Sequence, residues 1–238
     1  MNKLKLYIFS DFDGTITKKD IGDDIFIQFG KFEPLHSWLL DGEIDIFNYW
    51  KELFKTLNGS FTKENFENYL NQVEIDETFI DFANFCKLSN INLSIVSDGF
   101  DVYIKPILER YNLDWISLYS NRMLFNINTY TPDFYGVNDS CSCKSASCKR
   151  NTLITRAPEN AVLVYIGDGY SDYCPAKHCD IIFAKKNLAA YCNENKIPHY
   201  NFKNFSDILF ILKNRILTKK FKIRNQAYLL RKSAFENE

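Results

Sequence analysis

Two aspartates near the N-terminus, Asp11 and Asp13, are the residues whose types and spacing first indicate chemistry. They follow an apolar run at 6–9, and Gly14 and Thr15 come directly after them. An apolar run that ends in a turn signal is typical of a buried parallel strand. Two carboxylates one residue apart repel each other at the end of such a strand unless a cation or a shared proton lies between them. The alternative interpretation is an Asx-turn in which both acids are solvated.

Two further apolar runs, at 92–96 and 161–166, also end in polar turns. These turns carry Ser97, Asp98, Gly99, Asp168 and Asp172. Parallel strands place their C-terminal ends at the same edge of a sheet, so we expect the three turns to converge. Carboxylates without convergent histidines favour a hard cation, Mg²⁺ above all, and the hydroxyls and open amides beside it suit a phosphoryl oxygen. A lysine between the second and third turns, Lys144 or Lys149, would complete such a site.

The elements that must position these residues form an alternating pattern. Strands are expected at 6–9, 92–96, 115–119, 161–166 and 180–184, and helices at 102–111, 151–156, 188–194 and 205–216, with a hairpin or loop at 125–136. Strands that alternate with helices predict an α/β fold with a parallel sheet covered on both faces. Residues 20–88 show helical periodicity without strands, which predicts an insertion over the end of the first strand. The expected units are therefore 1–18 with 90–216 as the core, 19–89 as the inserted helices, and 217–238 as a basic C-terminal helix or tail.

Composition excludes some classes of function. The net charge of −1 argues against a whole-surface nucleic-acid or membrane binder, although 213–232 is strongly basic. No apolar segment approaches the length of a membrane span, and the N-terminal apolar run is too short for a signal peptide. Seven cysteines, an odd number, favour free thiols or a metal site over a disulfide framework. We expect a cytoplasmic protein, with a homodimer as the assembly considered and no nucleic acid as partner.

Taken in order, the polar turns resemble the motifs of the haloacid dehalogenase superfamily over nearly the whole chain. The matching residues are DFDGT at 11–15, Ser97, Lys149 and GDGYSD at 167–172. The resemblance implies a Rossmann-like core with an all-helical cap inserted between the first and second motif strands. It also implies a Mg²⁺-dependent phosphatase that hydrolyses a small phosphorylated metabolite through an aspartyl-phosphate. Asp13 favours a phosphatase over a dehalogenase, because only the phosphatases of this superfamily need a second, proton-donating aspartate.

The same resemblance implies a role for each motif residue. Asp11 would be the nucleophile and Asp13 the general acid and base. Asp11, the backbone carbonyl of Asp13 and Asp168 would hold Mg²⁺, with Asp172 in or near that shell. The residues that would bind the phosphate are Thr15, Ser97, Asp98, Gly99 and Lys149, with the contact after Ser97 made by the backbone amide.

The choice of lysine and of substrate depends on the subgroup. In the subgroup that the chain most resembles, the motif lysine follows a cysteine and precedes a helix, which favours Lys149 over Lys144. Asp20 lies where phosphoserine phosphatase-like members carry an acidic substrate-binding residue, and it also suits a helix N-cap. Residues 167–208 look closest to the methionine-salvage phosphatases that act on 2-hydroxy-3-keto-5-methylthiopentenyl-1-phosphate. Phosphoserine, phosphocholine and phosphoethanolamine are the alternative substrates.

Cys141, Cys143 and Cys148 form a second cluster, with Cys174 or Cys179 as a distant fourth ligand. Their spacing lacks the C-x₂-C pattern of zinc knuckles, so a bound metal and ordinary free thiols both stay open. A non-catalytic sensor of a phosphorylated ligand on the same fold is the alternative to an enzyme. The complete set of acids argues against that alternative.

Overall fold

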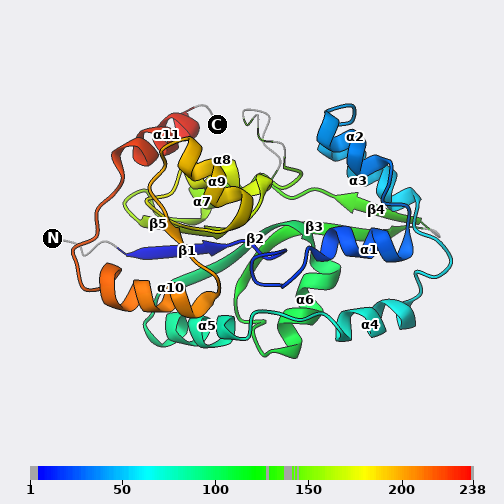
Figure 1. Ribbon diagram of the computed structural model, residues 1–238, viewed down its shortest axis with the longest axis horizontal. Coiled ribbons are helices and arrows are strands. Elements are labelled where there is room, and N and C mark those ends of the chain that lie inside the picture. The colour runs from blue at the N-terminus through cyan, green and yellow to red at the C-terminus, as the bar shows by residue number, and fades with distance from the viewer. Residues whose placement is uncertain (1–4, 127–128, 137–140, 142, 144, 237–238) are drawn as a thin grey trace.

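The computed structural model describes residues 5–126, 129–136, 141, 143 and 145–236, and a sheet runs through its centre (Figure 1). The sheet has the strand order β4-β3-β2-β1-β5-β6-β7 within the described residues. The strands are β1 (Leu6–Ser10), β2 (Asn92–Phe100), β3 (Ser117–Asn126), β4 (Thr129–Asp133), β5 (Val162–Gly167), β6 (Ile181–Ala184) and β7 (Tyr200–Asn201). Every neighbouring pair is parallel except β3 and β4, which form an antiparallel hairpin. The predicted α/β fold with a parallel sheet is confirmed.

Helices cover both faces of this sheet (Figure 1). They are α1 (Ile21–Phe29), α2 (Leu35–Asp41), α3 (Ile46–Lys55), α4 (Lys63–Asn71), α5 (Thr78–Leu88), α6 (Asp101–Arg110), α7 (Lys149–Arg156), α8 (Tyr173–Lys177), α9 (Lys186–Glu194), α10 (Phe205–Ile211) and α11 (Asn225–Glu236), with a 3₁₀ turn at Tyr170–Asp172 and a π turn at Leu212–Ile216. In Figure 1, α7, α8, α9 and α11 lie above the sheet, and α5, α6 and α10 lie below it. Helices α1 to α4, which we call the cap segment, lie at the end of the molecule that carries β4.

The central strands β1 and β5 are apolar on both sides, as strands between two helical layers must be. On β1, Ile8 belongs to the larger core cluster, whereas the next residue, Phe9, packs into the smaller one. On β5, Val164 belongs to the larger cluster and Tyr165 to the smaller one. Because successive strand residues point to opposite faces, this unbroken apolar pattern fixes both strands in the middle of the sheet.

Helix α5 covers the sheet, although the predicted boundary at residue 89 groups it with the inserted helices. Its Phe79 and Phe82 lie with ring centroids 4.7 and 5.3 Å from that of Phe205 on α10. The cap segment instead meets the β3–β4 hairpin region, where the rings of Phe47 and Phe134 are 5.1 Å apart. The domain boundaries stay a prediction.

Several elements differ in extent from the prediction. The strand expected at 115–119 continues to Asn126, because its pairing with β4 supplies hydrogen bonds beyond the apolar part. The helix expected at 205–216 is α-helical only to Ile211 and ends in the π turn. The short elements α8 and β7 were not predicted, since five and two residues are too few to show a period.

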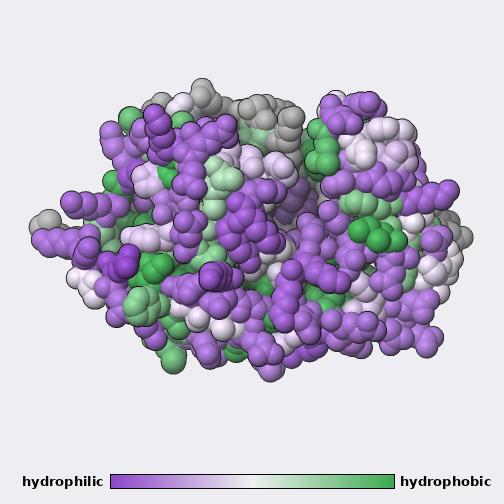
Figure 2. Space-filling model, viewed as in Figure 1, coloured by the Kyte–Doolittle hydropathy of each residue, from purple (hydrophilic) through white to green (hydrophobic). Residues whose placement is uncertain are grey.

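The basic C-terminal segment is partly tied to the core. Arg231 is buried, donates to the backbone carbonyl of His178 at 2.6 Å and lies 3.3 Å from Asp180. The backbone amide of Arg224 donates to the same carboxylate at 2.8 Å. The surface in Figure 2 is mainly hydrophilic, with separate hydrophobic spots. No helix within the described residues is long and apolar enough to cross a membrane.

Candidate active site

The strand register brings the three polar turns together at one edge of the sheet. Ser10 at the end of β1 lies opposite Ile166 of β5, and Asp11 donates its backbone amide to the carbonyl of Ile166 at 2.9 Å. The carboxylates of Asp11, Asp168 and Asp172 consequently offer oxygen atoms that all lie within 4.8 Å of one another. The edge therefore gathers three buried acids, as expected for the carboxyl ends of parallel strands.

Lys149, the first residue of α7, is 1% exposed and lies between two of these acids. Its ammonium is 2.8 Å from Asp11 Oδ1 and 2.7 Å from Asp172 Oδ1, and it donates to Ser171 Oγ at 2.9 Å. Burial lowers the pKa of Lys149, but attraction to the two carboxylates outweighs it and raises the pKa above its usual value. Burial and repulsion by Asp172 raise the pKa of Asp11, while Lys149 opposes that rise. One ammonium between two carboxylates leaves an excess negative charge, which favours a further cation.

Asp11 is held by only one of its two carboxylate oxygens. Oδ1 accepts from the backbone amide of Phe12 at 2.8 Å and from Lys149, whereas Oδ2 accepts no hydrogen bond from the described residues. Asp11 also lines the cavity described below. The arrangement fixes the carboxylate and leaves one oxygen for a ligand.

Asp172 has a different environment, because both of its oxygens are engaged. Oδ2 accepts from the backbone amides of Asp168 and Gly169 at 2.8 and 3.0 Å, and Oδ1 accepts from the hydroxyl of Tyr165 at 2.5 Å and from Lys149. These bonds suit a residue that shapes the turn after β5 and orients Lys149. A Cβ atom on Gly167 would overlap Asp172 Oδ2, which is held by two backbone amides, so the turn requires glycine there.

Asp13 lies beside Asp11 but contacts different elements. Its Oδ2 accepts from the hydroxyls of Tyr103 at 2.7 Å and Ser97 at 3.3 Å, and its Oδ1 accepts from the backbone amide of Ile21 at 3.0 Å. Burial, and repulsion by Asp20 after it, raise the pKa of Asp13 to about 7. A carboxyl group with this pKa exchanges a proton readily at neutral pH, which suits a general acid and base.

The second of the predicted polar turns, with Ser97, Asp98 and Gly99, lies within β2, which continues past the expected end at residue 96 to Phe100, and its register with β3 shifts between Val96 and Phe100. Ser97 accepts from the backbone amide of Gly99 at 2.9 Å, within this irregular part of the strand. The side chain of Asp98 points away from a phosphate-binding role, since it accepts from the backbone amide of Ser147 at 2.5 Å in the loop before α7. The predicted phosphate contact of Asp98 can therefore come from its backbone amide. A Cβ at position 99 would overlap the hydroxyl of Tyr103, so a side chain there must displace Tyr103 from Asp13.

Asp168 follows β5 and binds groups from two other segments. Oδ1 accepts from the hydroxyl of Thr15 at 2.9 Å, and Oδ2 lies 2.8 Å from the ammonium of Lys186. The Thr15 hydroxyl, predicted to bind phosphate, thus holds Asp168 in this structure. Gly14 approaches so closely, with φ +67° and a hypothetical Cβ 2.7 Å from Asp168 Oδ2, that no side chain fits. The oxygen donors of Asp11, Asp168 and Asp172 form a group that can hold a hard metal cation.

A cavity of about 760 Å³ lies over these acids, and residues of the cap segment line part of its wall. Asp20 lines it and caps α1, where it accepts from the backbone amide of Asp23 at 3.0 Å, so both interpretations of Asp20 fit its position. Asp23 also lines the cavity, and burial together with repulsion by Asp20 raises its pKa to about 8. The cap residues on the wall are Asp20, Gly22, Asp23, His36, Leu39, Leu40, Ile46, Tyr49 and Trp50.

Sequence reasoning missed Tyr103, Lys186 and Tyr165, each of which contacts a motif acid. Tyr103 and Tyr165 lie within an expected helix and an expected strand. An aromatic residue in such a pattern indicates a core position, so the sequence does not show that they contact the site. Lys186 follows β6 at the same edge of the sheet, and this position was the available signal. The alternative lysine, Lys144, lies outside the described residues.

Comparisons with known proteins agree with this geometry. The chain matches the family model described as "Putative Phosphatase" over residues 6–204. It is 30% identical to the 2-hydroxy-3-keto-5-methylthiopentenyl-1-phosphate phosphatase of Brevibacillus brevis, over 87% of this chain and 95% of that protein. It is 28% identical to the polyol phosphate phosphatase PYP1 of Saccharomyces cerevisiae, over 91% and 96%. A solved phospho-aspartyl intermediate analogue of phosphoserine phosphatase shares the fold, with a TM-score of 0.65, 19% identity, and coverage of 89% of this chain and 99% of that one.

The family match includes all three polar turns and Lys149, which together make the acidic edge of the sheet. The resemblance to the haloacid dehalogenase superfamily is confirmed, and with it the prediction of a phosphatase. The chain therefore belongs to the "Putative Phosphatase" family, and the protein is a phosphoric monoester hydrolase.

Proposed function

We propose that the protein hydrolyses a small phosphomonoester at the edge formed by Asp11, Asp13 and Lys149, through an aspartyl-phosphate on Asp11. The observation that carries the proposal is the contrast between the two neighbouring acids. Asp11 is fixed through Oδ1 and open at Oδ2, whereas Asp13 has a pKa of about 7. One acid is thus arranged as a nucleophile and the other as a proton carrier.

The proposed reaction has two steps. In the first, Asp11 Oδ2 attacks phosphorus, the bond from phosphorus to the ester oxygen breaks, and Asp13 gives its proton to the leaving oxygen. In the second, Asp13 takes a proton from water as that water attacks phosphorus, which releases phosphate and regenerates the Asp11 carboxylate. Lys149 offsets charge on the transferring group, and the Ser97 hydroxyl with the Asp98 amide holds an equatorial oxygen.

Mg²⁺ fits the donor set of the edge, and we propose that Asp11, Asp168 and the backbone carbonyl of Asp13 hold it. Oxygen-only donors and excess negative charge support this choice. When bound, the cation supplies charge that lets a carboxylate approach an anionic phosphate. The oxygens of Asp172 already accept hydrogen bonds from the turn after β5 and from Lys149, so Asp172 would orient the groups that bind Mg²⁺.

For the substrate, we propose 2-hydroxy-3-keto-5-methylthiopentenyl-1-phosphate, the compound in the name of the Brevibacillus brevis relative. The apolar cap side chains Leu39, Leu40 and Ile46 on the cavity wall support a substrate with an apolar tail such as a methylthio group. Phosphoserine fits less well, because its carboxylate needs a cation. Among the described residues that line the cavity there is no arginine, and the lysine there, Lys186, lies 2.8 Å from Asp168.

A polyol phosphate is the second candidate, named for the yeast relative. Two groups on the cavity wall support it. The Trp50 indole Nε1 is buried and has no hydrogen-bond partner among the described residues, and the carboxyl group of Asp23 accepts no hydrogen bond from them. A substrate with several hydroxyl groups would supply an acceptor for the indole and donors for the carboxyl group.

The proposed function is tested by steady-state turnover with Mg²⁺. Asp11→Asn should abolish hydrolysis of p-nitrophenyl phosphate and of both candidate substrates, whereas Asp81→Asn, a matched change at an exposed acid of α5, should leave it intact. Undiminished turnover by Asp11→Asn would rule out the assigned nucleophile. The ratio of kcat/KM for the two candidates decides the substrate, and Asp23→Asn should lower kcat/KM for the polyol phosphate selectively.

Homodimerisation and a cytoplasmic location are further parts of the proposal. Light scattering tests the first, and cell fractionation tests the second.

A further inference from the structure

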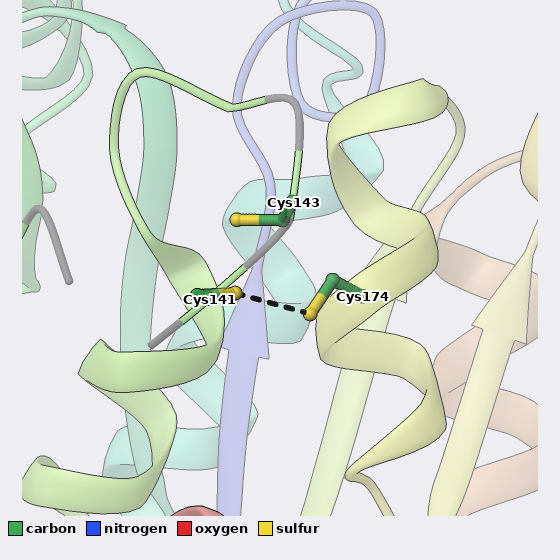
Figure 3. A group of neighbouring side chains, drawn as sticks. All are labelled: Cys141, Cys143 and Cys174. Atoms are coloured by element: carbon green, nitrogen blue, oxygen red, sulfur yellow. Dashed lines mark hydrogen bonds between the residues drawn. The ribbon is translucent and has the colours of Figure 1, made fainter. Parts of the chain in front are cut away.

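Four cysteines come together outside the acidic site, on two segments that are distant in sequence. Cys141, Cys143 and Cys148 lie in the loop before α7, and Cys174 lies on α8. Figure 3 shows Cys141 and Cys143 on the loop and Cys174 on the helix that faces it. Cys179, the other candidate for a fourth ligand, is instead buried in the smaller apolar cluster. The structure thus selects Cys174 as the partner of the loop cysteines.

Three of the four sulfurs lie at spacings that suit a tetrahedral metal site, and the fourth, that of Cys148, is close to one of them. The Sγ atoms of Cys141 and Cys174 are 3.8 Å apart, and those of Cys143 and Cys148 are 4.0 Å apart. The sulfurs of Cys141, Cys143 and Cys174 all lie within 4.8 Å of one another. A zinc ion with Zn–S bonds of about 2.3 Å places its four sulfurs about 3.8 Å apart, whereas a disulfide would need about 2.05 Å. All four cysteines are free thiols.

We propose that Cys141, Cys143, Cys148 and Cys174 bind one Zn²⁺ ion as a structural site. Thiolate sulfur is a soft donor that selects zinc and excludes Mg²⁺, so this site is chemically distinct from the acidic edge. Four protein ligands fill the tetrahedral shell and leave no open position for substrate or water. Binding releases the thiol protons to solvent and links the ion to folding of the loop.

The position of this zinc site gives it a specific consequence for the acidic edge. Cys148 immediately precedes Lys149, and Cys174 lies two residues after Asp172. The ion would therefore link the two segments that carry Lys149 and Asp172, whose Nζ and Oδ1 atoms are 2.7 Å apart. The sequence of the loop has few apolar side chains, so a metal would supply the contacts that hold its cysteines against α8.

Metal analysis of the full chain tests the proposal. Protein purified in reducing buffer and dialysed against Mg²⁺-containing, zinc-free buffer should contain about one zinc ion per chain by mass spectrometry. Cys141→Ala and Cys174→Ala should lose the zinc, whereas Cys192→Ala, a matched change at a buried cysteine of α9, should keep it. Absence of zinc from the wild type, iron in its place, or zinc retained by Cys174→Ala would each overturn the proposal.

A spectroscopic measurement on the wild type keeps the proposal testable if those variants do not fold. Replacement of zinc by Co²⁺ should give strong thiolate charge-transfer absorption and the d–d bands of a tetrahedral ion. Weak octahedral bands would place the cobalt at oxygen ligands and refute the thiolate site. A Cys141–Cys174 disulfide found by peptide mapping in zinc-free protein would likewise refute it, in favour of a redox pair.

Discussion

Replacement of Lys149 by methionine should destabilise the protein strongly, apart from any effect on catalysis. The ammonium is 1% exposed and lies within 2.8 Å of the carboxylates of Asp11 and Asp172. Methionine has a similar length but no charge, so the variant leaves two buried carboxylates facing each other. Removal of one partner from a buried ion pair costs about 3–5 kcal/mol. At about 2–4 °C per kcal/mol for a chain of this size, Tm should fall by about 6–20 °C.

The loss should depend on pH in a defined direction. Burial and Asp172 raise the pKa of Asp11, and Lys149 opposes that rise, so the pKa of Asp11 rises further in the variant. A carboxyl group whose pKa is raised on folding stabilises the fold while it is protonated, and this contribution is lost as pH increases through the folded-state pKa. The difference between wild type and Lys149→Met should consequently be small in acid and grow towards neutral pH.

The assay is urea unfolding in Mg²⁺-free buffer across this pH range. Lys105→Met, which removes an exposed ion pair with Asp101 at 3.0 Å, is the matched control and should change the free energy of unfolding by about 0–1 kcal/mol. The double variant Lys149→Met/Asp172→Asn restores the net charge of the group and should recover part of the lost stability without recovering turnover. A Lys149→Met protein as stable as the wild type at neutral pH would refute the view that this lysine offsets two buried charges.

Three further outcomes follow from the geometry. Burial and Asp20 raise the pKa of Asp13 to about 7, so kcat for an alkyl phosphate should fall as pH rises past that value. The fall should be weaker for p-nitrophenyl phosphate, because its leaving group needs no proton. Profiles of kcat against pH for the two substrates check this. Gly99→Ala places a Cβ against the Tyr103 hydroxyl and should lower kcat by about 100-fold without unfolding the protein, as measured by kinetics and circular dichroism. Phe205→Ala should cost about 3–5 kcal/mol in urea unfolding and leave kcat of the folded enzyme near the wild-type value.

The acidic edge was predictable because its signals are local. Asp11, Ser97 and Asp168 each follow an apolar run, and parallel pairing alone then brings them to one edge. Lys149 could be preferred over Lys144 because it leads into a helical segment, and α7 does begin at Lys149. In each case the information lay within a few residues of the site residue itself.

Contacts that depend on the tertiary fold could not be predicted from the sequence. The carboxylate of Asp98 binds an amide 49 residues further along the chain, a contact that the sequence did not indicate. Helix α5 has the same apolar period as the cap helices, and only its packing on Phe205 assigns it to the face of the sheet. Tyr103 reaches Asp13 across 90 residues, which no local pattern records. Sequence periodicity defines a face of a helix or strand but not the partner of that face.

The raised pKa of Asp13 depends in part on the cap segment. Burial is the largest cause of its raised pKa, and Asp20, at the start of α1, is the next. The backbone amide of Ile21, also at the start of α1, donates to Asp13 Oδ1 and opposes the rise. Displacement of α1 from the core would expose Asp13 to water and remove Asp20, and both changes lower the pKa. We therefore expect the contact between α1 and the core to keep Asp13 an effective acid at neutral pH.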